Sequence, residues 1–319
     1  TGSSGADQLF GSSGADTLTG GAGNDQFTAG IGGDTIAGGT GTDTFIGTTA
    51  LTAANIEGSG SGTSTGVVVN LGASTLTGAA ILGATTQNIS GSLTGVASGQ
   101  VAYLFNGELV TNSAAVDTLT SIENVTLADG INYIVGSDAA NVINGGTGAD
   151  TIIAGNGADT IDAGTGADTI TLTETAANEV VDALTQAAGD SVVATAKSAG
   201  MADTTAIAAT DTLTFGNGVD TITGFNAGAG GDTLDVGTAG AAITGIGVDE
   251  NDLTASKTLF FSGAYDAATG VFTIAADGAG ADTMIMDTTD AGDRDVLATD
   301  SVVILIGVDS DDLHADNFI

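Results

Sequence analysis

Residues 2–46 read GSSGADQLF GSSGADTLT GGAGNDQFT AGIGGDTIA GGTGTDTFI, which is one nine-residue pattern repeated without a slip. Each copy has a glycine-rich turn, an acidic residue and, two positions later, a large apolar residue. The same register returns over residues 136–171 as GSDAANVIN GGTGADTII AGNGADTID AGTGADTIT. The sixth position of successive copies holds Asp7, Asp16, Asp25, Asp34, Asp43, Asn141, Asp150, Asp159 and Asp168.

This pattern predicts an all-β solenoid. Glycine permits positive φ in the turn, and the three residues around each apolar position are long enough only for a short strand. Two copies then make one coil, so that copies n and n+2 stack. We expect a right-handed parallel β-roll with an apolar ladder inside it, formed by Leu9, Leu18, Phe27, Ile36, Phe45, Ile143, Ile152, Ile161 and Ile170.

The stacking brings acidic residues eighteen positions apart together, and this predicts metal sites. The pairs are Asp7 with Asp25, Asp16 with Asp34, Asp25 with Asp43, Asn141 with Asp159 and Asp150 with Asp168. Carboxylates and backbone carbonyls are hard oxygen donors that suit Ca²⁺, whereas zinc or copper would require His or Cys. The chain has no Cys and one His. We therefore expect about five Ca²⁺ or more; the competing interpretation is that these turns are merely solvated loops.

Other residues complete the predicted sites. Glycines that let the backbone approach an ion are expected at Gly21, Gly23, Gly30, Gly32, Gly146, Gly148, Gly155 and Gly157. Further along the chain, GNGVDTITG and GAGGDTLDV restore the pattern and add Asp220 and Asp232 as candidate ligands.

The nonapeptides resemble the repeats-in-toxin (RTX) family, whose parallel β-rolls bind Ca²⁺ in their turns. Three features depart from the consensus of that family: Asn141 replaces an aspartate, serine replaces the second glycine in the first two copies, and alanine stands at the first position of three others. The resemblance implies weaker binding at these turns.

Composition indicates a cation-dependent protein. The 39 acidic residues outnumber 3 basic ones, and the formal net charge is −36. Such a charge excludes nucleic acid and anionic lipid as direct partners. Adaptation to high salt is an alternative source of acidity, but it would scatter aspartates over the surface rather than on a nine-residue grid. We expect the metal-free chain to repel itself and to fold when calcium binds.

Composition also bears on location. No run of 18 apolar residues is present, so we expect no membrane insertion. The chain begins at Thr1 rather than Met, and we interpret it as a piece of a longer protein.

The organisation predicted from the sequence has five segments. Residues 1–47 and 136–171 are the repeat blocks, and 48–135 are a β-rich insertion that continues or flanks the roll. Residues 172–236 contain a linker, with a helix expected within 174–209, and further repeat-like turns. Residues 237–319 resemble the C-terminal cap and secretion signal of RTX proteins exported by type I machinery.

Nothing in the sequence predicts an active site, and we expect no enzyme. His314 is the single histidine and is surrounded by acidic residues, which favours a solvated position. Carboxylate pairs of the glycosidase kind remain an alternative, but the regularly spaced ones are already assigned to metal turns.

The Thr-, Ala-, Ser- and Gly-rich composition resembles that of bacterial surface-layer proteins. This resemblance implies an extracellular structural protein on the bacterial cell surface that self-associates into a lattice through calcium. A cell-surface polysaccharide is the partner expected for residues ahead of Thr1. The alternative is the C-terminal RTX module of a large secreted adhesin or exoenzyme.

Overall fold

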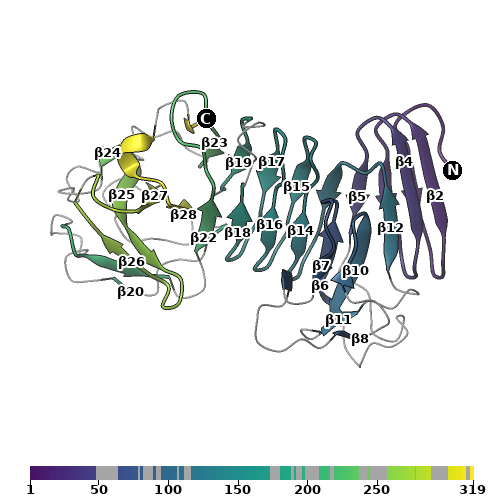
Figure 1. Cartoon of the computed structure of the whole chain (residues 1–319), viewed down its shortest axis with the longest axis horizontal. Helices are drawn as coiled ribbons and strands as arrows, with labels where there is room; N and C mark the ends of the chain where they lie inside the picture. Colours follow the sequence, from purple (N-terminus) through teal and green to yellow (C-terminus); the bar gives the residue numbers. More distant parts are fainter. Residues whose placement is uncertain are drawn as a thin grey trace. The chain divides into compact units, whose positions relative to one another are not determined.

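The computed structural model of this chain describes residues 1–47, 64–77, 80–81, 89–90, 95–105, 108–110, 116–172, 180–187, 190–191, 196–197, 208–215, 219–236, 243–244, 257–276, 278–288, 301–313 and 317–319. These residues belong to two compact units, Thr1–Thr160 and Ile161–Ile319. His314 lies outside the described residues. The predicted all-β fold built on parallel strands is confirmed in the described part of the chain (Figure 1).

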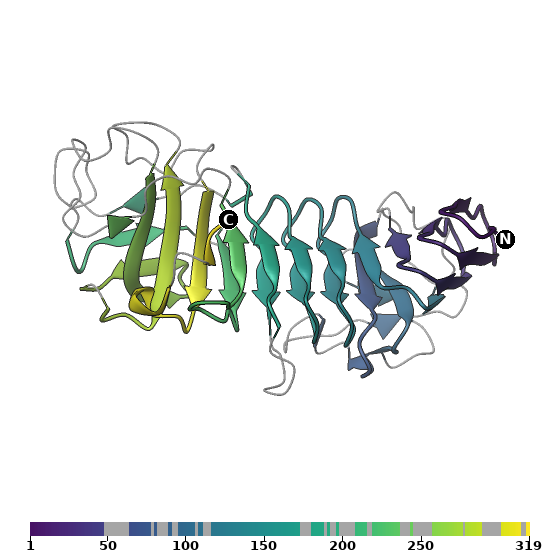
Figure 2. The ribbon, with the colours of Figure 1, turned by 90° about the horizontal axis from the view of Figure 1, so that it is seen from above.

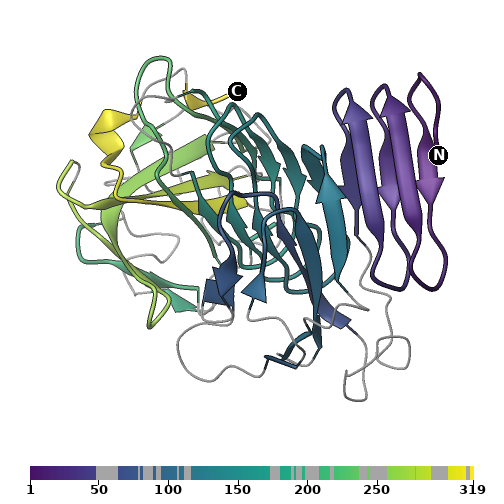
Figure 3. The same ribbon diagram turned by 45° about the vertical axis from the view of Figure 1, so that its right-hand side comes forward.

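The first sheet of unit 1 stacks one short strand from every coil. Its parallel strands are, in spatial order, β1 (Gln8–Phe10), β3 (Gln26–Thr28), β5 (Thr44–Ile46), β13 (Asn124–Thr126) and β15 (Val142–Asn144). The predicted apolar ladder runs through this sheet, because Leu9 lies opposite Phe27 and Phe27 opposite Phe45. Figure 3 shows the strands of the first coils side by side. Phe27 and Phe45 are fully buried.

The second sheet of unit 1 contains an interruption. Its strands are, in spatial order, β2 (Thr17–Ala22), β4 (Thr35–Thr40), β12 (Asp117–Thr120), β10 (Gln100–Phe105), β6 (Ser64–Asn70), β14 (Tyr133–Val135) and β16 (Thr151–Ile153). All neighbours are parallel except that β10 runs antiparallel to both β12 and β6. Strands β10 and β6 therefore separate β12 from β14, as Figure 1 shows.

The interruption has no counterpart in the first sheet. In the first sheet β13 pairs directly with β15. In the second sheet the corresponding strands β12 and β14 are separated by β10 and β6. Because neighbouring strands lie about 4.8 Å apart, the second sheet is about 10 Å wider at this point. Beyond the interruption, the second sheet of unit 1 resumes parallel pairing of β14 with β16, in the teal part of Figure 2.

Short strands surround the interruption and enclose a second core. Strand β11 (Glu108–Val110) pairs with β10 and with β8 (Ile89–Ser90), and β7 (Leu76–Thr77) pairs with β9 (Gly95–Val96). The buried side chains that meet here are Val68, Val96, Ala102, Leu104, Leu109, Val116 and Tyr133. This part of the chain consequently has a cluster of seven buried side chains in addition to the ladder of the repeats.

Unit 2 begins with roll strands and ends in an antiparallel sheet. The strands of its large sheet are, in spatial order, β18 (Thr169–Thr171), β22 (Asp220–Thr223), β28 (Ser301–Ile306), β27 (Asp282–Thr288), β25 (Lys257–Asp266), β26 (Val271–Ile274), β21 (Thr212–Thr214) and β20 (Ala196–Lys197). Strand β24 (Ile243–Thr244) pairs with β25, and Ser310–Asp312 form a 3₁₀ turn. β17 (Thr160–Asp162) begins at the last residue of unit 1.

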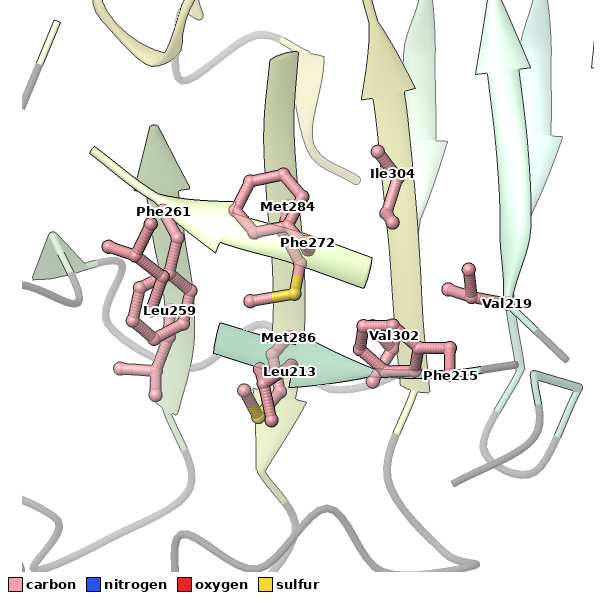
Figure 4. Packing of buried hydrophobic residues seen from close by; sticks show 11 residues of the cluster. Leu213, Phe215, Val219, Leu259, Phe261, Phe272, Met284, Met286, Val302 and Ile304 are labelled. Carbon is pink, nitrogen blue, oxygen red and sulfur yellow. The ribbon is translucent and has the colours of Figure 1, made fainter. Parts of the chain in front are cut away.

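The core of unit 2 lies between its antiparallel strands. Figure 4 shows Phe261, Phe272 and Met284 directed toward one another, with Ile304 from β28 beside them. All four side chains are fully buried. The C-terminal part of the chain thus has an apolar core of its own kind, unlike the single ladder of the repeats.

The helix predicted within residues 174–209 is wrong for the residues described there. Residues Ala183–Thr185 form strand β19, which pairs in parallel with β23 (Thr233–Asp235), and Leu184 lies opposite Leu234. Leu184 is buried, whereas Val180 and Val181 are each 42% exposed. A helical apolar face would have buried Val180 and Leu184 together. Among the described residues, none lies in a helix of the length and apolarity needed to cross a membrane.

Candidate metal centre

The turns bring backbone into close contact with backbone, and glycine makes this contact possible. The eight glycines expected near the ions all have φ between 98° and 142°, a range that side chains strongly disfavour. Space is also restricted: a Cβ on Gly39 would lie 2.1 Å from the carbonyl oxygen of Gly21 in the coil before it. The pattern of glycines therefore sets how closely successive turns can stack.

Each aspartate is held by the aspartate one coil away. The backbone N–H of Asp7 donates to Oδ1 of Asp25, and the N–H of Asp25 donates to Oδ1 of Asp43, both at 2.8 Å. On the other side of the roll, the N–H of Asp16 donates to Oδ1 of Asp34, also at 2.8 Å. The carboxylates thus form two rows, with neighbours eighteen residues apart in the sequence.

The second carboxylate oxygen is what makes these rows candidate cation sites. In Asp25, Asp34 and Asp43, Oδ2 is buried and receives no hydrogen bond. The oxygen faces the backbone of its own turn, since a Cβ on Gly20 would lie 2.1 Å from Oδ2 of Asp25. A buried carboxylate oxygen without a donor is costly unless a positive charge lies beside it.

The charges in each row repel one another. Burial raises the pKa of Asp34 and the pKa of Asp43 above the usual value, and the charges of Asp16 and Asp25 respectively raise them further, against hydrogen bonds that lower them. A divalent cation between coils removes this repulsion and supplies the missing partner of Oδ2. No three His, Cys, Asp or Glu side chains of the described residues converge on one point. The remaining ligands of such an ion would therefore be backbone carbonyl oxygens of the glycine turns.

The second block and unit 2 repeat this geometry. Asp150 and Asp159 each accept a backbone N–H from the coil before, at 2.7 and 2.8 Å. In unit 2, the N–H of Asp168 donates to Oδ1 of Asp220 at 2.7 Å, although 52 residues separate them. Asp232 accepts the N–H of Asp182 in the same way, at 2.9 Å.

The structure adds four residues to the rows that sequence reasoning missed: Asp117, Glu123, Asn132 and Asp182. Asp117 accepts the N–H of Asp34 at 2.9 Å, and Oε2 of Glu123 accepts the N–H of Asp43 at 2.9 Å. Burial raises the pKa of Asp117 to about 7. Asp117, Glu123 and Asp182 lack the preceding glycines, and Asn132 keeps only Gly130, which has a φ of 123°. The apolar residue two positions later was therefore the main signal present in all four.

Some positions in the rows have partners other than a cation. Oδ2 of Asp220 accepts hydrogen bonds from Nε2 of Gln186 at 2.6 Å and from Oγ of Ser191 at 2.9 Å. Oδ2 of Asp7 accepts the N–H of Ser3, and Oδ2 of Asp16 accepts the N–H of Ser12. The carboxylates of the first coil and of Asp220 therefore differ from those of Asp25, Asp34 and Asp43.

Comparison with known families agrees with this geometry. The family model of the RTX calcium-binding nonapeptide repeat, in four copies, matches residues 1–36, 28–49 and 129–170. Both repeat blocks therefore match the RTX nonapeptide repeat. RTX repeats bind calcium, so the unsatisfied carboxylates of Asp25, Asp34 and Asp43 lie in calcium-binding segments. No curated protein matches the chain.

Proposed function

We propose that this chain is a calcium-dependent structural protein of a bacterial cell surface, exported by type I machinery, which self-assembles into a surface-layer lattice. The observation that supports it is the row of buried carboxylates whose Oδ2 atoms receive no hydrogen bond. A chain built in this way is stable only when cations lie between its coils. Calcium is plentiful outside the cell, so this requirement is met there.

The first ions would lie beside Asp25, Asp34 and Asp43, with turn carbonyls as further ligands. We propose about five Ca²⁺ or more for the whole chain, to which Asp150, Asp159 and Asp168 would contribute. At Asp220 and Asp232, Oδ2 already accepts hydrogen bonds, so we do not extend the calcium proposal to these two. Bound calcium supplies positive charge and ties one coil to the next. The chain's own residues set the spacing, through the hydrogen bonds from each backbone N–H to the carboxylate of the next coil.

Assembly follows from the charge that remains. Five Ca²⁺ would offset ten charges, which leaves about −26 of the formal −36. Copies of this protein therefore repel one another until further divalent ions bridge their surfaces. Calcium would then control both folding and self-association, at separate concentrations.

Calcium titration with two readouts tests the proposal. Circular dichroism should show β structure forming as calcium is added, and β signal unchanged by a chelator would refute calcium-dependent folding. At higher calcium and high protein concentration, electron microscopy should show sheets or tubes. A strictly monomeric X-ray scattering profile under those conditions would refute lattice formation and leave calcium binding intact.

A further inference from the structure

We propose that the segment between the two repeat blocks is held by neutral hydrogen-bond donors in place of calcium, and that it stays folded when calcium is removed. This joining segment consists of β6, β10, β12 and β14 with the turn at Asn132. The inference rests on the proposed calcium dependence of the blocks, because it concerns where that dependence stops. It assigns different roles to carboxylates and amides that occupy the same position of the roll.

Asn132 occupies an aspartate position and supplies its own donor. It is 1% exposed, and its Oδ1 accepts the backbone N–H of Val67 at 2.9 Å. Its Nδ2 donates to the carbonyl oxygens of Gly145 at 3.0 Å and of Gly130 at 3.4 Å. An amide offers both donors and an acceptor, whereas an ionised carboxylate offers only acceptors. The amide nitrogen therefore contacts turn carbonyls, the class of oxygen that Ca²⁺ takes as ligand.

Tyr103 provides the corresponding donor for a carboxylate. Its hydroxyl, on the antiparallel strand β10, donates to Oδ2 of Asp117 at 3.1 Å, while Oδ1 of Asp117 accepts the N–H of Asp34. Tyr103 is 3% exposed and Asp117 is fully buried. The oxygen that receives no hydrogen bond in Asp25, Asp34 and Asp43 is thus satisfied here by a neutral group. The row formed by Asp16, Asp34 and Asp117 thus meets a neutral donor, the Tyr103 hydroxyl, at Asp117.

Asn141 does the same where the other row meets the joining segment. Its Oδ1 accepts the N–H of Ser137 at 2.7 Å, and its Nδ2 donates to the carbonyl oxygen of Glu123 at 2.5 Å. The side-chain amide is buried, and it already bonds its own turn at Ser137 and the coil before it at Glu123. We therefore do not extend the calcium proposal to Asn141, although its sequence position suggested a ligand.

Apolar packing makes the joining segment stable by itself. Val68, Ala102, Leu104, Leu109 and Tyr133 belong to one buried cluster, whereas each nonapeptide contributes chiefly its one ladder residue to the inside of the coil. Burial of apolar surface stabilises a fold whether or not an ion is bound. In a solenoid, structure that has formed at one place can extend to its neighbours. The joining segment would therefore present β12 and β14 as templates to the two blocks.

Hydrogen exchange of the full chain, followed by mass spectrometry, tests this inference. In calcium, peptides covering the described strands of residues 1–160 should be protected. In chelator, peptides covering β6, β10 and β12 should keep their protection, whereas peptides covering residues 8–46 should lose theirs. Loss of protection in every peptide would overturn the inference and leave the calcium proposal standing. Full protection of the blocks in chelator would overturn the proposed function itself.

Two variants test the named donors. Asn132→Asp removes the amide donor and should make the joining segment calcium-dependent, so that its protection in chelator falls about tenfold or more and returns with calcium. Tyr103→Phe, which orphans Oδ2 of Asp117, should have the same effect on peptides from β10 and β12. Asn124→Asp is the matched control: Asn124 lies in β13 outside the aspartate position, and its Oδ1 accepts the N–H of Val142, which a carboxylate can also do. Protection in chelator that is unchanged in both test variants, or lost equally in the control, would overturn the assignment.

Discussion

Asp25→Ala should be more damaging than Asp7→Ala, and the two changes together test the stacking register. Asp25 lies between Asp7 and Asp43 in one carboxylate row, whereas Asp7 has only Asp25 as a neighbour in its row among the described residues. Asp25 is 1% exposed and accepts the N–H of Asp7. The carboxylate of Asp7 is half-buried, and its hydrogen bond with Ser3 is exposed, so water can replace it.

The expected difference follows from ions and hydrogen bonds. At a calcium concentration of about 100 times Kd, each lost ion lowers the free energy of unfolding by about 2.7 kcal/mol. Asp25→Ala removes a ligand from two ion positions and Asp7→Ala from one. The hydrogen bond from Asp7 to Asp25 adds about 1 kcal/mol. Asp25→Ala should therefore cost about 3–4 kcal/mol more than Asp7→Ala, by the same two estimates.

Urea unfolding in calcium, followed by circular dichroism, measures these free energies, and a calcium titration gives the midpoint for each variant. Asp138→Ala is the control, because Asp138 is an exposed carboxylate outside the aspartate position. It removes the same charge and should change the free energy of unfolding by no more than about 0.5 kcal/mol. Equal midpoints for Asp25→Ala and Asp7→Ala would refute the register of the rows.

Three further changes test the turns, the ladder and the C-terminal contact by thermal denaturation in saturating calcium. Gly20→Ala should cost about 1–3 kcal/mol, because the new Cβ would lie 2.1 Å from Oδ2 of Asp25; an unchanged Tm would contradict that close approach. Ile36→Ala should cost about 2–5 kcal/mol, whereas Phe10→Ala, at a side chain 69% exposed, should stay within about 0.5 kcal/mol. Asn317→Ala should cost about 1–3 kcal/mol, because the buried amide accepts the N–H of Gly228 and donates to the carbonyl of Asp232; a variant as stable as the parent protein would show that these bonds contribute nothing.

Local sequence was sufficient for the coil. The turn glycines, the sixth-position acid and the eighth-position apolar residue recur within nine residues, so the period of the roll and the ladder through Phe27, Ile36 and Phe45 could be predicted. The pairing of Asp25 with Asp43 follows directly, because equal repeats stack at a fixed separation. Val180 and Leu184 misled the prediction, because their spacing fits a helix equally well and only the pairing of Leu184 with Leu234 decides for a strand.

What only the tertiary structure decided is where the rows go when the repeat stops. Asp117 and Glu123 join the rows of Asp34 and Asp43 from about 80 residues away, because a free strand edge accepts any segment that returns to it with the right register. The nine-residue pattern likewise does not predict the antiparallel strand β10 or the position of its Tyr103. The sequence by itself determined the positions of the carboxylates within the two repeat blocks. Which of these carboxylates need a cation depends on the hydrogen-bond donors that folding places beside each buried oxygen. Burying an oxygen without a donor lowers the free energy of unfolding, whereas a donor largely removes that penalty.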